Sequence, residues 1–198
     1  MVHNMDKGDY ISPLLRSNKT VFSFRDIALL WRSPTTNAAR VRINYYVKNG
    51  ELVHLRKGLY AKDVHYDRLE LAAKIYIPSY VSFETVLAKA GVVFQFYEQI
   101  FAASYLTREV SVDTQTYAFR KIKNFVLTNP MGIENKKNCS IAGIERAFLD
   151  TVYINVDYHF DNLSPVNWDR VFNVLPIYKN KTMEKRVQKI AGAFKVGE

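Results

Sequence analysis

Residues 35–61 decide the fold, and they read TTNAARVRINYYVKNGELVHLRKGLYA. When the first half of this stretch is placed on a helix at 100° per residue, it separates into a polar face and an apolar face. The apolar face consists of Ala39, Ile43 and Tyr46. The polar face consists of Asn37, Arg40, Asn44 and Lys48, with Val41 at its edge. The sequence therefore predicts a helix that packs on a core and leaves a polar side free.

The ends of this helix are also marked. Thr35 or Thr36 can act as its N-cap, because a hydroxyl there accepts a hydrogen bond from an otherwise unpaired backbone N–H. Gly50 stands where a helix commonly ends in a left-handed residue. Residues 52–60 then predict two short strands, with a bend or bulge at Gly58. A helix, a tight stop and a basic hairpin are typical of the DNA-reading half of a winged helix-turn-helix domain.

The residue types suit two kinds of DNA contact. Arginine and asparagine on a helix form bidentate hydrogen bonds with guanine or adenine edges, whereas lysine suits phosphates. Residues 36–62 hold six Lys or Arg and one acid, which predicts a log–log salt slope of about −5 if all six bind phosphate. Arg42 falls on the flank of the apolar face, and a solvated basic helix beside a surface hairpin is the alternative. The predicted DNA-binding set is Thr35, Thr36, Asn37, Arg40, Arg42, Asn44, Lys48, His54, Arg56 and Lys57.

The chain before this stretch supplies two further helices. Residues 9–16 have one apolar side, and residues 24–31 repeat apolar side chains at helical spacing. Ser23 and Asp26 resemble a capping box at the start of the second helix. The composition turns polar after residue 61, so we predict one domain over residues 1–65 and a second over 66–198.

The second domain is predicted to be α+β, with an antiparallel sheet and flanking helices. Ser82 and Ser140 are predicted helix N-caps, and Gly91 a helix stop. Runs of β-branched and aromatic residues predict strands that form an antiparallel meander. The predicted strands are 101–107, 109–113, 116–122 and 125–128, and the other predicted helices are 69–75, 168–175 and 182–194.

Composition limits the remaining classes of protein. The chain has 198 residues and a net charge of +9, of which 11 basic and 5 acidic residues within 1–65 give +6. This uneven charge favours an anionic partner for the first domain. The single Cys139 excludes a disulfide framework, and the four histidines are dispersed, so we predict no metal or other cofactor. No signal-like or membrane-length apolar run occurs, which predicts a soluble, cytoplasmic protein.

Three phrases, in order, resemble the AbiEi-type antitoxin family. LVHLRKGLYA at residues 52–61 looks like the wing of these proteins, and PSYVSFETVL at 78–87 is similar to the opening of their second domain. ERAFLD at 145–150 is similar to a later helix of the family. The resemblance covers roughly residues 20–155, and the tail beyond Asn155 matches nothing in the family.

The resemblance implies a bacterial type IV antitoxin. Its winged helix would repress its own operon by binding double-stranded promoter DNA, expected to carry inverted repeats. Its second domain would counter a nucleotidyltransferase-like toxin without forming a stable complex. The winged-helix role falls on Asn37, Arg40, Asn44, Lys48, Arg56 and Lys57. Glu145, Arg146 and Asp150 are candidates for an antitoxic set, or else for a structural ion-pair set.

Two other classes of function compete with this one. An enzyme acting on nucleic acids would need clustered carboxylates or a phosphate-binding glycine loop, and neither occurs in the sequence, so we predict no catalytic site. A ligand-responsive regulator without a toxin partner is the stronger alternative. The 14% aromatic content could line a sensor pocket, although aromatic residues more often fill a core.

Overall fold

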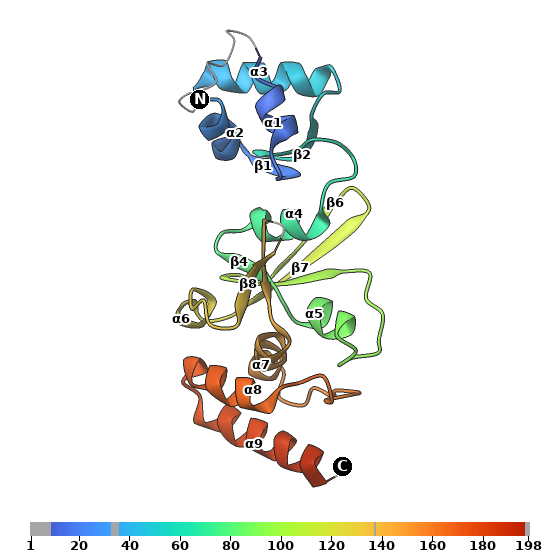
Figure 1. Cartoon of the computed structure of the whole chain (residues 1–198), viewed down its shortest axis with the longest axis vertical. Coiled ribbons are helices and arrows are strands. Elements are labelled where there is room, and N and C mark those ends of the chain that lie inside the picture. The colour runs from blue at the N-terminus through green and yellow to red at the C-terminus, as the bar shows by residue number, and fades with distance from the viewer. Residues whose placement is uncertain (1–8, 33–35, 137, 197–198) are drawn as a thin grey trace.

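The chain folds into an elongated α+β structure. The computed structural model describes residues 9–32, 36–136 and 138–196. Figure 1 shows a small sheet packed with helices at one end, a larger sheet in the middle, and helices at the other end. We call the described residues up to 61 the N-terminal part, and those from 66 onward the C-terminal part.

The N-terminal part contains three helices and a three-stranded antiparallel sheet with strand order β1-β3-β2. Strand β1 is absent from the sequence prediction, and it pairs Val21 with Ala61 and Ser23 with Leu59. Its three residues are too few to show an alternating pattern. The elements are α1 (Ser12–Arg16), β1 (Val21–Ser23), α2 (Phe24–Leu30), α3 (Asn37–Lys48), β2 (Val53–Arg56) and β3 (Leu59–Ala61).

Several local predictions for the N-terminal part are confirmed. Ser23 and Asp26 form a capping box at the start of α2, in which each side chain bonds the other residue's backbone N–H. Gly50 has φ 73° directly after the C-cap of α3, and Gly58 has φ 77° in the hairpin turn. Gly58 therefore forms the predicted bend. A bulge lies elsewhere, within β2, where the register against β3 shifts between His54 and Arg56.

The C-terminal part is built on a six-stranded mixed sheet with strand order β6-β7-β5-β4-β9-β8. Helices α7, α8 and α9 lie at the end of the molecule far from α3 (Figure 1). The elements are α4 (Arg68–Ile75), β4 (Ser79–Val81), α5 (Glu84–Lys89), β5 (Ile100–Ser104), β6 (Arg108–Val112), β7 (Gln115–Lys121), α6 (Asn124–Leu127), β8 (Ile133–Lys136), β9 (Cys139–Ala142), α7 (Ile144–Ile154), α8 (Trp168–Val174), the 3-10 helix η1 (Leu175–Tyr178) and α9 (Lys181–Val196).

The predicted antiparallel meander is wrong. Strand β5 pairs with β7 in parallel, and β4 pairs with β9 in parallel, so the sheet joins segments far apart in the sequence. Residues 125–128, predicted as a strand, fall largely within helix α6. The alternation of apolar residues identifies strands but not their partners, which tertiary packing selects.

Both serines predicted as N-caps have other roles. Ser140 lies in strand β9, and Gly143 is the N-cap of α7. Ser82 precedes the N-cap of α5, which is Phe83 with a positive φ of 57°. The Ser82 hydroxyl instead donates to the buried carboxylate of Asp150, at 2.7 Å. The chain thus places Phe83 at the helix start, and the Ser82 hydroxyl makes a charge-assisted hydrogen bond as a donor instead of accepting a backbone N–H.

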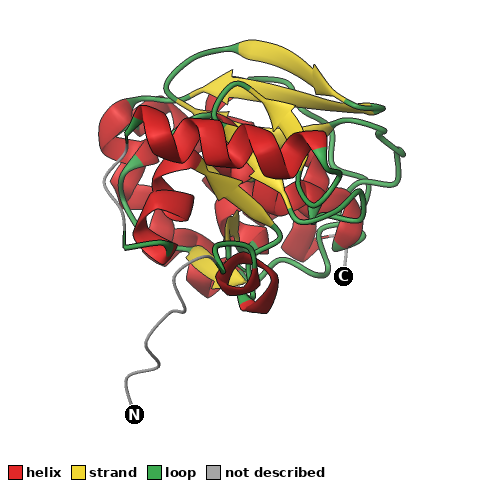
Figure 2. Ribbon diagram, turned by 90° about the horizontal axis from the view of Figure 1, so that it is seen from above, coloured by secondary structure: helices red, strands yellow, loops and turns green. Residues whose placement is uncertain are grey.

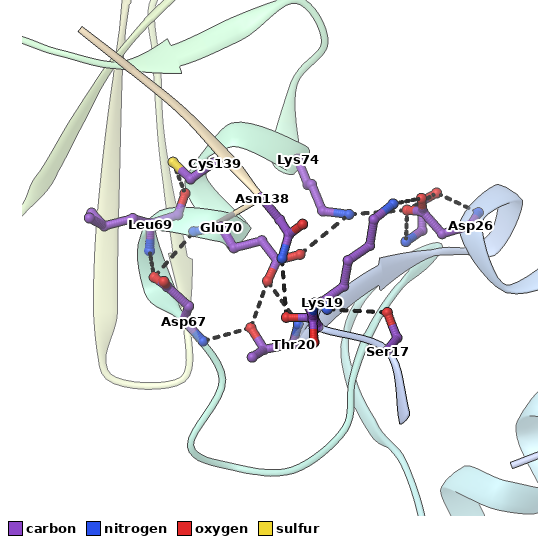
Figure 3. A network of polar contacts seen from close by, with 12 residues as sticks. Ser17, Lys19, Thr20, Asp26, Asp67, Leu69, Glu70, Lys74, Asn138 and Cys139 are labelled. Atoms are coloured by element: carbon purple, nitrogen blue, oxygen red, sulfur yellow. Dashed lines mark hydrogen bonds and ion pairs between the residues drawn. The ribbon is translucent and has the colours of Figure 1, made fainter. Parts of the chain in front are cut away.

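The two parts meet at a polar joint (Figure 3). The backbone N–H and the hydroxyl of Thr20, just before β1, both donate to Glu70 on α4, each at 2.8 Å. Lys74, also on α4, lies 3.1 Å from the Asp26 carboxylate on α2. The Asn138 amide donates to the carbonyl of Asn18 at 3.1 Å. The joint holds the N-terminal part on α4 and on the β8–β9 hairpin.

Candidate nucleic-acid interface

Helix α3 lies across one end of the molecule, nearest the viewer in Figure 2. Thr36 is its N-cap, and its hydroxyl accepts a hydrogen bond from Ala39 N at 3.4 Å. The predicted apolar face is buried, because Ala39, Ile43 and Tyr46 all pack in the core of the N-terminal part. The opposite face is exposed, and its residues are Asn37, Arg40, Val41, Asn44, Tyr45 and Lys48.

The tip of the β2–β3 hairpin lies on the same side as Arg40. The Arg40 guanidinium lies 5.3 Å from the centre of the Phe24 ring. The backbone N–H of Phe24 donates to the carbonyl of Gly58, in the hairpin turn, at 2.9 Å. Phe24 therefore connects Arg40 to the turn that carries the exposed Lys57.

A shallow hollow of about 530 Å³ separates α3 from strand β2. His54 is exposed on β2, and its ring lies 5.4 Å from that of Tyr60 on the neighbouring strand. The hollow therefore brings His54 beside the helix residues that sequence spacing placed on one face. Its lining consists of Val41, Asn44, Tyr45, Val47, Lys48 and His54.

Two predicted arginines point away from this surface. The guanidinium of Arg42 lies 3.6 Å from the centre of the Tyr10 ring, which anchors it beside the core. Arg56 lies 5.9 Å from the ring of Tyr76, a residue of the C-terminal part. Its Nη1 is buried and has no hydrogen-bond partner among the described residues. The remaining member of the predicted set, Thr35, lies outside the described residues.

Sequence reasoning missed one basic residue that follows Phe24, the residue whose ring Arg40 contacts. Arg25 is exposed in the first turn of α2, directly after Phe24. The capping box that fixes the start of α2 was visible in the sequence, and it could have identified Arg25 as a basic residue at a helix start. We add Arg25 to the candidate surface, which then carries Arg25, Asn37, Arg40, Asn44, Lys48, His54 and Lys57.

Comparison with known proteins adds no assignment. No protein-family model matches the chain, and no curated protein matches its sequence. Within the described part of the chain, no three His, Cys, Asp or Glu side chains gather as metal ligands would. Among the helices of these described residues, none is both long enough and apolar enough to cross a membrane.

Glu145, Arg146 and Asp150, the candidates for an antitoxic or a structural ion-pair set, do not form one cluster. They divide into a buried pair and a separate glutamate. Arg146 and Asp150 are both fully buried, and Arg146 Nε lies 3.3 Å from the Asp150 carboxylate. Arg146 also donates to the backbone carbonyls of Val126 and Met131, at 2.7 and 2.8 Å. Glu145 instead accepts a hydrogen bond from the backbone N–H of Asn167, at 3.3 Å.

Two tyrosines complete the surroundings of the buried pair. Tyr80 and Tyr178 donate to Asp150 at 3.0 and 2.7 Å. Burial, reinforced by the Asp150 charge, raises the pKa of both phenols well above the ordinary value, so they remain protonated donors. Because every partner is internal, this geometry favours the structural interpretation of Arg146 and Asp150 over a surface for an external molecule.

Proposed function

We propose that the chain is a DNA-binding protein whose N-terminal part is a winged helix. Helix α3 is the recognition helix in this proposal, and the β2–β3 hairpin is the wing. The element order α1-β1-α2-α3-β2-β3 supports it, because a helix-turn-helix followed by an antiparallel hairpin presents one helix to the major groove.

One observation carries this proposal: the polar face of α3 is exposed along its whole length at one end of the molecule. A helix is about 10–12 Å wide with its side chains, which matches the roughly 12 Å width of the major groove. Asn37, Arg40 and Asn44 suit base edges, and Lys48 and Lys57 suit phosphates on either side.

We further propose that the protein is an antitoxin of the AbiEi type that represses its own operon. The resemblance of residues 52–61, 78–87 and 145–150 to that family supports this proposal. The C-terminal part would counter a nucleotidyltransferase-like toxin without a stable complex, and would need no cofactor and no catalysis of its own. Both roles belong to the bacterial cytoplasm.

Fluorescence-anisotropy titration tests DNA binding, using the DNA upstream of the protein's own gene and a scrambled duplex. We expect a preference of about a thousandfold for the upstream DNA at physiological salt. Arg42 and Arg56 are turned away, and Lys62 donates to the backbone carbonyl of Leu15. The three remaining phosphate candidates, Arg25, Lys48 and Lys57, predict a log–log salt slope of about −2.7. Equal and weak binding to both duplexes would refute sequence-specific repression.

Growth rescue tests the antitoxin role. A nucleotidyltransferase-like toxin encoded beside this gene is expressed alone, with the full chain, or with an Arg40→Ala variant. We expect both forms of the chain to restore growth, because Arg40 lies on α3 and the antitoxic role belongs to the C-terminal part. Failure of both forms to restore growth would reject the antitoxin role while leaving DNA binding intact.

A ligand-responsive regulator remains the second candidate, and one cavity favours it. A cavity of about 750 Å³ opens beside Arg68, at the start of α4, and Phe96, Tyr97 and Gln115 are among its lining residues. Helix α4 also carries Glu70 and Lys74 of the polar joint. A ligand bound in the cavity beside Arg68 would therefore act on the N-terminal part through this helix. A thermal-shift screen with aromatic and anionic metabolites, followed by DNA titration, would favour this candidate if one compound changed both melting and DNA affinity.

A further inference from the structure

Helix α9 carries a row of lysines at the end of the molecule opposite α3. Its apolar side is buried, through Met183, Val187 and Ala191. The other side is exposed and includes Lys181, Lys185 and Lys189, which we call the lysine row. Figure 1 shows α9 as the outermost element at this end of the long axis.

The lysine row is regular, and one acid lies beside its first member. Its members are four residues apart, so their backbones follow one another at intervals of about 6 Å along one side of the helix. Among the side chains that the structure describes, the acid of this helix is Glu184. It lies about 60° around the axis from Lys181, but about 100° from Lys185 and 140° from Lys189. Lys179 precedes the row, with its Nζ 5.5 Å from the Phe125 ring.

The chemistry of the row favours nucleic acid over a protein or a membrane. Protein interfaces are depleted in lysine and need an apolar centre, whereas Ile190 and Phe194 on α9 pack against the core. A helix that binds a membrane surface inserts its apolar side, and the apolar side of α9 is already buried. A DNA duplex presents about one negative charge per 1.7 Å of its axis, which a row of compact ammonium charges fits.

We propose that the lysine row binds the phosphate backbone of a second segment of double-stranded DNA. Since α3 and α9 lie at opposite ends, one chain would then connect two duplex segments. The connection of two segments rests on the proposed function of α3, whereas DNA binding by the lysine row does not.

The test uses the full chain and a charge-matched control. Lys185→Gln/Lys189→Gln removes two charges from the row, and Arg108→Gln/Lys121→Gln removes two exposed charges from strands β6 and β7. All four side chains are exposed, so both variants should melt like the wild type. Both variants are made in an Arg40→Ala/Lys48→Ala background, so that α3 contributes little, and anisotropy with a scrambled duplex across a salt series measures binding. We expect the row variant to flatten the log–log salt slope by about 1.8, and the control to leave it unchanged.

A second assay measures the connection directly. Upstream DNA on beads captures the protein, and a fluorescent scrambled duplex is then added in excess. We expect the wild type and the control to retain the fluorescent duplex on the beads, and the row variant to lose it. The proposal would be overturned if the row variant retained the fluorescent duplex and kept the wild-type salt slope. It would also be overturned if the control variant lost as much fluorescent duplex from the beads as the row variant.

An α3 variant separates this proposal from the proposed function. Suppose that Arg40→Ala/Lys48→Ala no longer binds the upstream DNA, while the row variant binds both duplexes as the wild type does. Then α3 binds DNA and the lysine row does not. If the row variant alone loses the scrambled duplex, the lysine row binds DNA and α3 has a different role.

Discussion

Glu70 gives the sharpest test of how the two parts of the chain are held together. Its side chain is 1% exposed, and one carboxylate oxygen accepts both the N–H and the O–H of Thr20 at 2.8 Å. The other oxygen lies 3.6 Å from Lys74 Nζ. Glu70→Ala removes the acceptor that joins β1 to α4 and leaves these donors unpaired.

The magnitude follows from these contacts. Each hydrogen bond to a buried charged group contributes about 1.5–3 kcal/mol, and an unpaired buried donor adds a cost. Water can reach the half-buried Thr20 in part, so we expect Glu70→Ala to lower the free energy of unfolding by about 3 kcal/mol. Glu70→Gln keeps a neutral acceptor, and its expected cost is about 1–2 kcal/mol.

The two tryptophans allow each part to be followed separately. Trp31 is buried in the core of the N-terminal part, and Trp168 begins α8 in the C-terminal part. Trp168→Phe leaves Trp31 as the reporter, and Trp31→Phe leaves Trp168. In guanidinium titrations we expect the Glu70→Ala transition reported by Trp31 to move to lower denaturant than the one reported by Trp168.

An exposed glutamate provides the control for this experiment. Glu134 is paired with Lys136, and its side chain is 54% exposed, so Glu134→Ala should change the free energy of unfolding by less than about 0.5 kcal/mol. If Glu70→Ala shifts both reporters equally, or neither of them, then the hydrogen bonds of Glu70 do not hold the N-terminal part in place.

Three further predictions concern DNA contacts, pH and the buried pair. Arg40→Ala should cost about 1–3 kcal/mol of operator affinity and relax base preference, whereas Lys57→Ala should weaken all DNA equally and flatten the salt slope by about 0.9, both measured by anisotropy. Burial opposes the ionisation of Asp26, but hydrogen bonds from Lys19 and Ser23 and the Lys74 charge hold its pKa well below the ordinary value. Ionised Asp26 therefore adds to the free energy of unfolding above about pH 4, and this contribution is lost as the pH falls toward the pKa of Asp26 in the folded state. In an acid titration of stability, the Asp26→Asn variant should lack the part of the decrease that the wild type owes to Asp26. Arg146→Met should cost about 3–5 kcal/mol in chemical denaturation because it leaves the Asp150 carboxylate buried, whereas Glu145→Gln should cost less than about 0.5 kcal/mol.

Local patterns predicted the elements of the N-terminal part well. The faces of α3, the capping box at Ser23 and the left-handed Gly50 and Gly58 depend on residues within a few positions of one another. Strand β1 depends instead on a partner about 40 residues away, because its residues pair with those of β3. Its three residues, Val21, Phe22 and Ser23, therefore carried no detectable signal of their own.

The orientation of single side chains was beyond the reach of the sequence. Arg56 follows His54 in a basic strand, and sequence spacing gives no reason to separate them. The bulge between them changes the direction of Arg56, which then meets Tyr76 of the C-terminal part. In the same way, helical spacing separates Glu145 from Asp150, but the burial of Asp150 depends on Tyr80 and Tyr178, from distant elements.

The polar joint also decides what the two basic ends of the chain can do together. Glu70 and Lys74 fix the N-terminal part on α4, and so fix the direction of α3 relative to α9. A rigid chain that binds two duplexes would hold them at one separation. A chain with a loosened joint would allow the two duplexes a range of separations. Under conditions where the N-terminal part stays folded, we therefore expect Glu70→Ala to bind single duplexes as the wild type does. Energy transfer between dyes on two connected duplexes should show a broader distance distribution in this variant. A distribution as narrow as that of the wild type would mean that contacts other than the Glu70 hydrogen bonds fix the two ends.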